Sequence, residues 1–278
     1  MPYVETKDST RLYYKDWGSG KPVVFISGWA LSSEMWNYQM IDLSTQGLRC
    51  IAYERRGHGR SDDPGQGYIY DTLADDLSSL LEHLDLHDVM LVAHSMGSGE
   101  LVRYLTRYGS ERVSRCVFIG TALPFPLKTE DNPMGFDRTP VEMTRSEWRR
   151  DFPRWVQENA APYFGEGLPG CSVSPELTEW TKSDMFRTSH KAILDCNQAL
   201  IETDFRAELR EISLPSLIIH GDSDRSFPVE MSGMIAAQLL PHNRFIIYEN
   251  GPHGLYITHM ERLNSDLLSF ALEGQSSF

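Results

Sequence analysis

Residues 89–102 read Val89-Met90-Leu91-Val92-Ala93-His94-Ser95-Met96-Gly97-Ser98-Gly99-Glu100-Leu101-Val102. An apolar, strand-like run meets a turn of small residues, and a helical pattern begins directly after it. In a sharp strand-to-helix turn of this kind the backbone is strained and the serine hydroxyl is exposed to a substrate. Ala93 and Gly97 are small enough for the strand and the helix to approach closely. The stretch therefore predicts that Ser95 is a nucleophile; the alternative is a tight turn that merely contains a serine.

The length and charge of the chain favour one large α/β domain. The chain has 278 residues, of which 41% are hydrophobic, and a formal net charge of −13. A chain of this length can bury a substantial core. The negative charge repels phosphate backbones and anionic lipids, so we expect no nucleic-acid partner and no membrane association. No apolar run approaches the roughly 20 residues that cross a bilayer.

The cysteines and the N-terminal residues indicate a cytoplasmic protein. Cys50, Cys116, Cys171 and Cys196 are scattered, and we expect all four to be reduced and structural. The first residues lack the basic and then apolar pattern of a signal peptide. No metal-ligand spacing, phosphate-binding loop or dinucleotide fingerprint occurs, so we expect neither a metal nor a cofactor. The sequence leaves open whether the chain forms a homo-oligomer.

Strand-like and helix-like segments alternate twice along the chain. Residues 1–123 and 212–278 both show this alternation, which predicts a mostly parallel sheet flanked by helices. Residues 124–211 interrupt it with aromatic and charged residues and with helical stretches at 146–159 and 175–209. We therefore expect a helical cap inserted between two parts of one α/β core. The strands are expected at 11–17, 22–27, 49–53, 113–120, 215–220 and 244–248, with one further strand directly before Ser95. The core helices are expected at 33–45, 71–86, 229–240 and 257–272, with one further helix directly after Ser95.

Two further residues complete a candidate catalytic set with Ser95. A serine hydroxyl needs an adjacent base, and the base needs an acid to orient it. His253 follows the last predicted strand between glycines, and Asp224 follows the strand before it. Such positions lie at the carboxyl ends of parallel strands, where open α/β sheets place their sites. Taken alone, a histidine in such a loop is more often a surface residue than a catalytic base. Asp222 competes with Asp224 as the acid, although we favour Asp222 as a turn former.

Acyl transfer also requires donors for the developing oxyanion. The backbone N–H of Met96, next to the nucleophile, is one candidate. The N–H of Trp29, in the loop after the strand at 22–27, is the other. Aromatic side chains suggest an apolar substrate pocket beneath the cap. We expect it to be lined by Trp29, Phe125, Phe164 and Phe227, with Trp155 and Tyr163 nearby; His94 is expected to be a buried structural residue.

With these residues in place, the chain resembles the α/β-hydrolase superfamily, and in particular its cofactor-free haloperoxidase, arylesterase and perhydrolase branch. The resemblance covers nearly the whole chain and is weakest in the cap. It implies the α/β-hydrolase fold, a triad of Ser95, Asp224 and His253, and an oxyanion hole formed by Trp29 and Met96. The segments that carry it are 55–61 (RRGHGRS), 71–77 (DTLADDL), 94–100 (HSMGSGE), 201–205 (IETDF) and 252–254 (PHG).

The chain departs from the pattern of that branch at four positions. Ser27 stands where the branch usually has histidine. Ala30 stands where its perhydrolases carry the proline that favours hydrogen peroxide over water. Ser226 and Phe227 replace two apolar residues that are commonly found before a proline. These differences imply a pocket of altered shape and polarity and argue against efficient perhydrolysis.

The sequence thus predicts a serine hydrolase that cleaves small carboxylic esters, lactones included, through an acyl-enzyme on Ser95. One alternative is a cofactor-free perhydrolase that forms peroxyacids and so has apparent haloperoxidase activity. Another, from a different class, is a ligand receptor that keeps the fold but has little turnover. Dehalogenase chemistry is disfavoured because it needs an aspartate at the nucleophile position.

Overall fold

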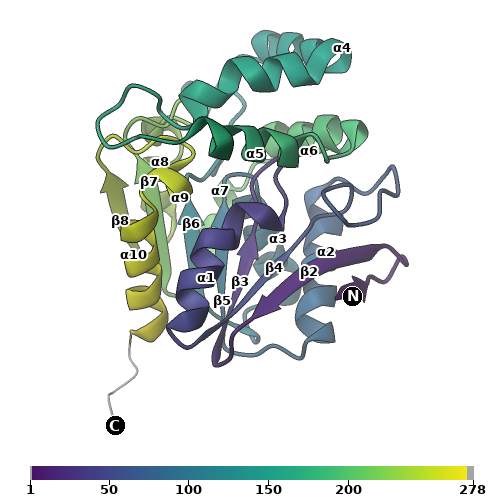
Figure 1. Cartoon of the computed structure of the whole chain (residues 1–278), viewed down its shortest axis with the longest axis vertical. Helices are drawn as coiled ribbons and strands as arrows, with labels where there is room; N and C mark the ends of the chain where they lie inside the picture. Colours follow the sequence, from purple (N-terminus) through teal and green to yellow (C-terminus); the bar gives the residue numbers. More distant parts are fainter. Residues whose placement is uncertain (1, 274–278) are drawn as a thin grey trace.

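The computed structural model describes residues 2–273, and its centre is one eight-stranded sheet (Figure 1). The strand order is β1-β2-β4-β3-β5-β6-β7-β8. Strands β1 and β2 are antiparallel, β2 joins β4 antiparallel, and all pairs from β4 to β8 are parallel. The mostly parallel α/β sheet is therefore confirmed. Its strands are β1 (Tyr3–Glu5), β2 (Arg11–Trp17), β3 (Lys21–Ile26), β4 (Leu48–Tyr53), β5 (Val89–His94), β6 (Val113–Ile119), β7 (Ser216–Gly221) and β8 (Asn243–Tyr248).

Helices cover both faces of this sheet. Helices α1 and α10 pack together on one face, whereas α2, α3, α7 and α8 follow one another on the other. Among the described helices, none is long and apolar enough to cross a membrane. The helices are α1 (Asn37–Thr45), α2 (Tyr70–His83), α3 (Gly97–Tyr108), α4 (Arg138–Tyr163), α5 (Pro175–Met185), α6 (His190–Glu202), α7 (Arg206–Glu211), α8 (Gly233–Leu239), α9 (Leu255–Thr258) and α10 (Met260–Leu272), with 3-10 turns η1 (Ser33–Trp36) and η2 (Val229–Met231).

The sequence of strand β3 is a continuous apolar run, without alternation of polar and apolar residues, because both faces of the strand are buried. Val23 and Phe25 belong to the core under α1 and α10, and Val24 and Ile26 belong to the core under α2 and α3. A parallel strand between two helical layers buries both of its faces. The same arrangement buries Cys50 on β4 and Cys116 on β6. Cys171 and Cys196 are buried outside the sheet, and all four cysteines are unpaired thiols.

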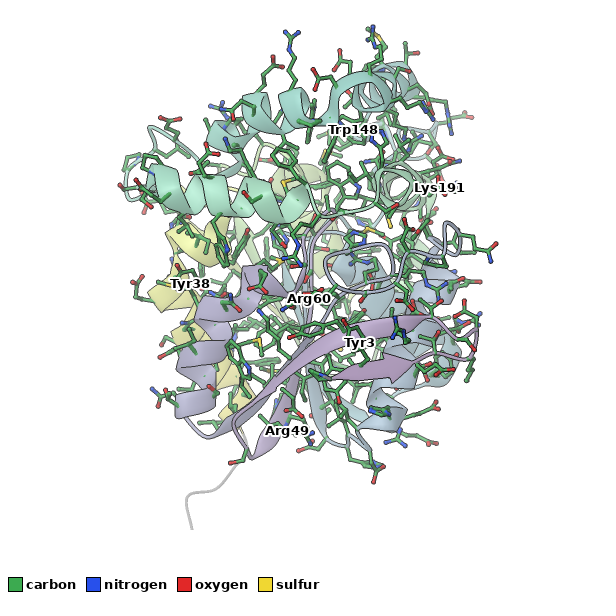
Figure 2. All side chains as sticks on the ribbon, turned by 45° about the vertical axis from the view of Figure 1, so that its right-hand side comes forward. Tyr3, Tyr38, Arg49, Arg60, Trp148 and Lys191 are labelled. Carbon is green, nitrogen blue, oxygen red and sulfur yellow. The ribbon has the colours of Figure 1, made fainter. Side chains whose placement is uncertain are left out.

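Three helices, α4, α5 and α6, form a layer over the carboxyl ends of the strands, and we call them the cap layer (Figure 1). Trp148 and Lys191 lie in this layer, well above Tyr3 and Arg49 of the sheet (Figure 2). The prediction of one helical stretch at 175–209 is wrong, because the structure has three separate helices there, α5, α6 and α7. Helix α4 is also longer than expected and is interrupted by non-helical backbone at Asp151.

Helix α7, although inside the interval assigned to the cap, does not belong to the cap layer. It packs against α3 and α8, and Leu209 is buried in the core beside the sheet. The layer that covers the site is therefore shorter than residues 124–211. The division at 123 and 211 remains a prediction about domains.

Candidate active site

Ser95 occupies the sharp turn between β5 and α3. Its φ is +51°, a left-handed conformation that a non-glycine residue rarely adopts, and its N–H donates to the carbonyl of Ile119 at 3.0 Å. Gly97 has to be small, because a Cβ there would lie 2.7 Å from the carbonyl oxygen of Ile26 on the neighbouring strand. The small-residue pattern around Ser95 thus reflects close packing between α3 and the end of β3.

His253 and Asp224 meet at the ends of β7 and β8. His253 Nδ1 lies 2.7 Å from Asp224 Oδ2, and both side chains are buried. The other carboxylate oxygen, Oδ1, accepts hydrogen bonds from the N–H groups of Ser226 and Phe227, each at 2.9 Å. Asp222, the competing acid, is exposed and accepts only from the adjacent Ser223 hydroxyl.

The charge of Asp224 is held by its neighbours. Burial alone would raise the pKa of its carboxyl, but the charge of His253 and hydrogen bonds from His220 and His253 outweigh burial and lower the pKa below its usual range. His220, on β7, is fully buried 3.3 Å from Asp224 Oδ2. Asp224 is therefore ionised and can stabilise a positive charge on the His253 ring.

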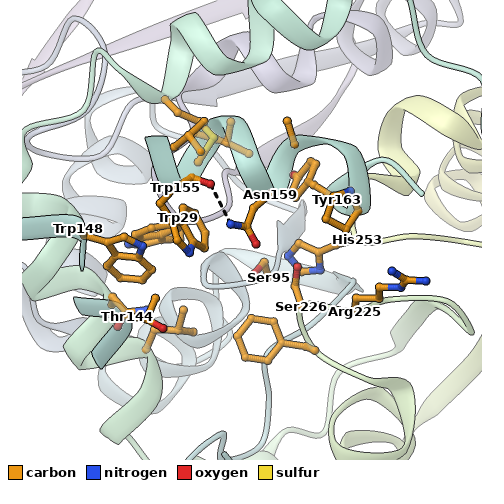
Figure 3. Close-up of a pocket in the computed structure, with 18 of the residues that line it drawn as sticks. Trp29, Ser95, Thr144, Trp148, Trp155, Asn159, Tyr163, Arg225, Ser226 and His253 are labelled. Carbon is orange, nitrogen blue, oxygen red and sulfur yellow. Dashed lines mark hydrogen bonds between the residues drawn. The ribbon is translucent and has the colours of Figure 1, made fainter. Parts of the chain in front are cut away.

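Ser95 and His253 open into the same cavity, where the His253 ring lies beside Ser95 (Figure 3). Among the hydrogen bonds of residues 2–273, none joins Ser95 Oγ to His253 Nε2. In unliganded sites this contact is often long and tightens when the substrate binds. The structure thus brings the predicted nucleophile, base and acid together, with the base held in place by the acid.

The two predicted oxyanion donors lie at the ends of adjacent strands, since β3 and β5 are paired. Within the described chain, the N–H groups of Trp29 and Met96 have no protein acceptor, whereas the nearby N–H groups of Ser95 and Leu31 both have one. Buried backbone donors are almost always paired. Two free donors next to a candidate nucleophile are the arrangement that an oxyanion would satisfy.

Arg55 fixes the loop that carries Trp29. Its Nη2 donates to the carbonyl of Ser27 at 2.8 Å and its Nη1 to the carbonyl of Gly28 at 3.2 Å. The same guanidinium forms a buried ion pair with Glu100 in the first turn of α3. One side chain therefore ties the Trp29 loop to the helix that follows Ser95. Sequence reasoning quoted both residues but gave them no role, because nothing local to either one indicates the contact.

The cap layer holds the same loop from above. The Asp184 carboxylate accepts from Ser32 N–H at 2.9 Å and from Ser32 Oγ at 2.5 Å. Thr188 Oγ1 donates to the carbonyl of Ala30 at 3.1 Å. Trp29 Nε1 donates to the carbonyl of Ile193 at 2.8 Å. Three hydrogen-bonded contacts thus join residues 29–32 to α5, α6 and the connection between them.

Three other histidines, His94, His58 and His220, are buried, and of these His94 also lines the cavity. His94 Nε2 bonds to the carbonyl of His253 at 3.0 Å, and burial, with the nearby His253, lowers its pKa to about 3. His58 is fully buried, and its Nδ1 lies 2.9 Å from the carbonyl of Arg56. His220 contacts the carbonyl of Phe227 at 2.9 Å. His94 has the buried structural role expected from sequence.

The cavity above Ser95 has a volume of about 630 Å³ and is mainly apolar. Trp29, Phe164 and Phe227 line it, as do Trp155 and Tyr163. Phe125 does not line it and leaves the set of candidate substrate contacts. Its ring is buried in the core, with the Arg206 guanidinium 5.4 Å from its centre.

Asn159 is a cavity residue that sequence reasoning missed. Its side chain projects from α4 into the cavity and lies above Ser95 in the view of Figure 3. The spacing of Trp155, Asn159 and Tyr163, four residues apart, was the available signal, because it places all three on one helix face.

In the part of the chain that the structure describes, no group of three His, Cys, Asp or Glu side chains is arranged to hold a metal ion.

Known proteins share this fold and its length. Residues 21–260 match the model of the alpha/beta hydrolase fold family. A non-heme haloperoxidase of Rhodococcus erythropolis is 39% identical over 278 residues, which cover 97% of this chain and 99% of that protein. A bifunctional esterase/perhydrolase of Acinetobacter calcoaceticus is 38% identical over 280 residues, with the same coverage.

A solved structure gives the same result in three dimensions. The bromoperoxidase from Bacillus anthracis superposes with a TM-score of 0.92 at 39% sequence identity, covering 96% of this chain and 98% of that one. Identity of this level over nearly the full length, together with the family match, shows the relationship. The chain belongs to the α/β-hydrolase fold family, in the branch that contains the non-heme haloperoxidases.

Proposed function

We propose that the protein is a serine hydrolase of the carboxylesterase type, acting on small carboxylic esters and lactones. The observation that carries the proposal is the 2.7 Å contact between His253 Nδ1 and Asp224 Oδ2, beside a serine held at φ +51° in the same cavity. The free N–H groups of Trp29 and Met96 support it. The esterase activity named for the Acinetobacter relative agrees with it.

The arrangement accounts for each step of ester cleavage. His253 Nε2 takes the proton of Ser95 Oγ as that oxygen attacks the carbonyl carbon. The carbonyl oxygen becomes an oxyanion and accepts hydrogen bonds from the Trp29 and Met96 N–H groups. His253 then gives the proton to the leaving alcohol, which leaves an acyl group on Ser95. A water molecule deprotonated by His253 attacks this ester, and release of the carboxylic acid restores Ser95.

The cap layer is proposed to bound the substrate. Its α4 and α5 contribute about half of the residues that line the cavity, and the lining is rich in aromatic side chains. A cavity of about 630 Å³ suits a small molecule. We propose that residues 124–211 are an insertion between core segments 1–123 and 212–278, and that its helices α4, α5 and α6 form the cap over the site.

The proposal is tested by Ser95→Ala. We expect hydrolysis of p-nitrophenyl acetate to fall to the background rate, because no other group in the cavity occupies the nucleophile's position. Ser98→Ala is the matched control: Ser98 is buried one turn further along, and its hydroxyl has no hydrogen-bond partner. It should keep both activity and fold. Circular dichroism checks folding, and turnover retained by Ser95→Ala would refute the assignment.

Perhydrolysis is the second candidate, favoured by the haloperoxidase and perhydrolase names of the relatives. The backbone angle of one loop residue argues against perhydrolysis. Ala30, next to the oxyanion loop residue, has φ +60°. Proline is restricted to φ near −65°. The loop of this chain therefore differs in backbone from a loop with proline at that position. Monochlorodimedone bromination in acetate and peroxide, divided by the rate of ester hydrolysis, measures the balance between the two reactions.

A further inference from the structure

The cavity that contains the proposed nucleophile also contains an unsatisfied hydrogen-bond acceptor. Asn159 Nδ2 donates to the carbonyl of Trp155 at 2.8 Å, one turn back on α4. That contact fixes the amide orientation, because the reverse orientation would set two oxygens against each other. Oδ1 therefore faces the cavity, where no described residue donates to it. Figure 3 shows the amide between Trp29 and His253 and above Ser95 in that view.

A second polar group lies across from it. The backbone N–H of Ser226 is held by Asp224 Oδ1 at 2.9 Å, so the residue is anchored to the proposed acid. Its hydroxyl borders the cavity and has no partner among residues 2–273. Ser226 lies beside His253 in Figure 3. A hydroxyl can both donate and accept, whereas the Asn159 carbonyl can only accept.

Much of the remaining cavity lining is apolar, although the charged residues Lys182 and Arg225 also line it. Trp29, Trp155, Tyr163 and Phe227 form much of the remaining wall near Ser95. An ester whose acyl and alcohol parts are both hydrocarbon would displace water from Asn159 Oδ1 and Ser226 Oγ without forming a hydrogen bond to either atom. Leaving a polar group unpaired in this way is unfavourable. A substrate with its own donor would replace the lost water.

We propose that Asn159 and Ser226 form a polar subsite that selects esters or lactones bearing a hydroxyl or amide N–H within a few bonds of the reacting carbonyl. The inference deepens the proposed function and rests on it. A site built to bind a substrate hydroxyl discriminates against the analogue that lacks it more strongly than an apolar pocket can reject a polar analogue. The subsite thus predicts a substrate class and not merely a substrate size.

The experiment compares matched substrates. For the wild-type protein, kcat/KM is measured for ethyl 3-hydroxybutyrate against ethyl butyrate, ethyl lactate against ethyl propionate, and 2-hydroxyethyl butyrate against propyl butyrate. The first two pairs place the hydroxyl on the acyl side, and the third places it on the alcohol side. We expect at least one pair to favour the hydroxylated member by about tenfold, since the acceptor is otherwise unpaired.

Asn159→Leu keeps the size of the side chain and removes the acceptor. It should bring the favoured ratio to within about twofold of unity while raising kcat/KM for the apolar member. Ser226→Ala should reduce the same ratio by a smaller factor. Thr144→Val, which removes a hydroxyl elsewhere in the same cavity, should leave the ratio as in the wild type.

The possible results separate the two proposals. Hydrolysis of no ester at all refutes the proposed function. Hydrolysis of both members of every pair with ratios near unity, or a preference that Asn159→Leu leaves intact, refutes the subsite and leaves the hydrolase standing. A preference lost in Asn159→Leu but kept in Thr144→Val supports the subsite.

Discussion

Two non-glycine residues beside the proposed reacting groups have left-handed backbone, Ser95 at φ +51° and Ala30 at φ +60°. Such a conformation costs about 1–2 kcal/mol for a residue with a side chain. It persists only where surrounding contacts hold it, as at many functional sites. For Ser95 these contacts are the packing of α3 on β3. For Ala30 they are full burial and the hydrogen bond from Thr188.

Ala30→Pro tests the loop conformation. Since proline cannot adopt φ +60°, the 29–31 backbone must rearrange and move the Trp29 N–H. We expect ester hydrolysis to fall about a hundredfold or more, in line with the loss of one oxyanion donor, with a lower thermal midpoint. The ratio of perhydrolysis to hydrolysis should be measured in parallel. Unchanged hydrolysis and an unchanged midpoint would show that the loop does not depend on this angle.

Residues in local motifs could be located from sequence, and residues defined by distant contacts could not. Ser95 lies in a recognisable turn, and Asp224 and His253 each follow a strand. Arg55 acts through Ser27 and Gly28, which are 28 and 27 positions away. Phe125 was misplaced for a related reason: an aromatic residue at the start of the cap interval is equally compatible with core and cavity.

At the scale of elements, the loop after β3 is a shared part of the sheet domain and the cap layer. From below it is bound by Arg55, and from above by Asp184 and Thr188. Any shift of α5 or α6 would therefore be transmitted to the Trp29 N–H. The cap layer is expected to set the rate of the chemical step as well as the shape of the cavity.

Thr188→Val tests this coupling with an isosteric change. It removes the hydrogen bond to the Ala30 carbonyl, so the loop is held less firmly when the oxyanion forms. We expect kcat to fall several-fold with little change in KM, because the affected contact is made in the transition state. Ser183→Ala, which removes an exposed hydroxyl bonded within α5, is the control and should change neither constant. A change confined to KM would contradict the coupling.

Element boundaries were least predictable in the cap. Helices α5 and α6 are separated by residues 186–189, and α6 and α7 by residues 203–205. Neither break contains glycine or proline, so the sequence shows no stop signal. Tertiary contacts make the first break, since Ser189 N–H donates to the carbonyl of Gly57 at 2.7 Å. The sheet strands were easier, because each is a short apolar run.

For the whole molecule, buried ionisable groups link stability to pH. Burial, followed by the charge of Arg55, lowers the pKa of His58 to about 3 from its ordinary value of 6.5. Between these values the unfolded chain binds a proton that the folded chain does not, so stability falls as the pH falls from 6.5 toward 3. Asp184, whose pKa is raised by burial, acts in the opposite direction.

His58→Asn isolates one of these contributions. The amide can still donate to the Arg56 carbonyl but does not titrate. As the pH falls below 6, the free energy of unfolding of the wild type should fall relative to that of the variant, by up to about 1.4 kcal/mol per pH unit. Urea denaturation at pH 6.5, 5.5 and 4.5 gives the free energy of unfolding of the two proteins. Because Asp184 is present in both, its contribution cancels in the difference between them. Parallel pH curves would contradict the burial of a neutral His58.

The sheet order has a consequence for synthesis on the ribosome. The central strands β3 and β5 bring Trp29 and Ser95 together early, but Asp224 and His253 follow β7 and β8, near the other end of the chain. At typical translation rates, His253 is added about 8 to 30 seconds after Ser95. Throughout that interval the nascent chain carries a serine without its base. Hydrolytic activity is therefore expected to appear only when the last strand has joined the sheet.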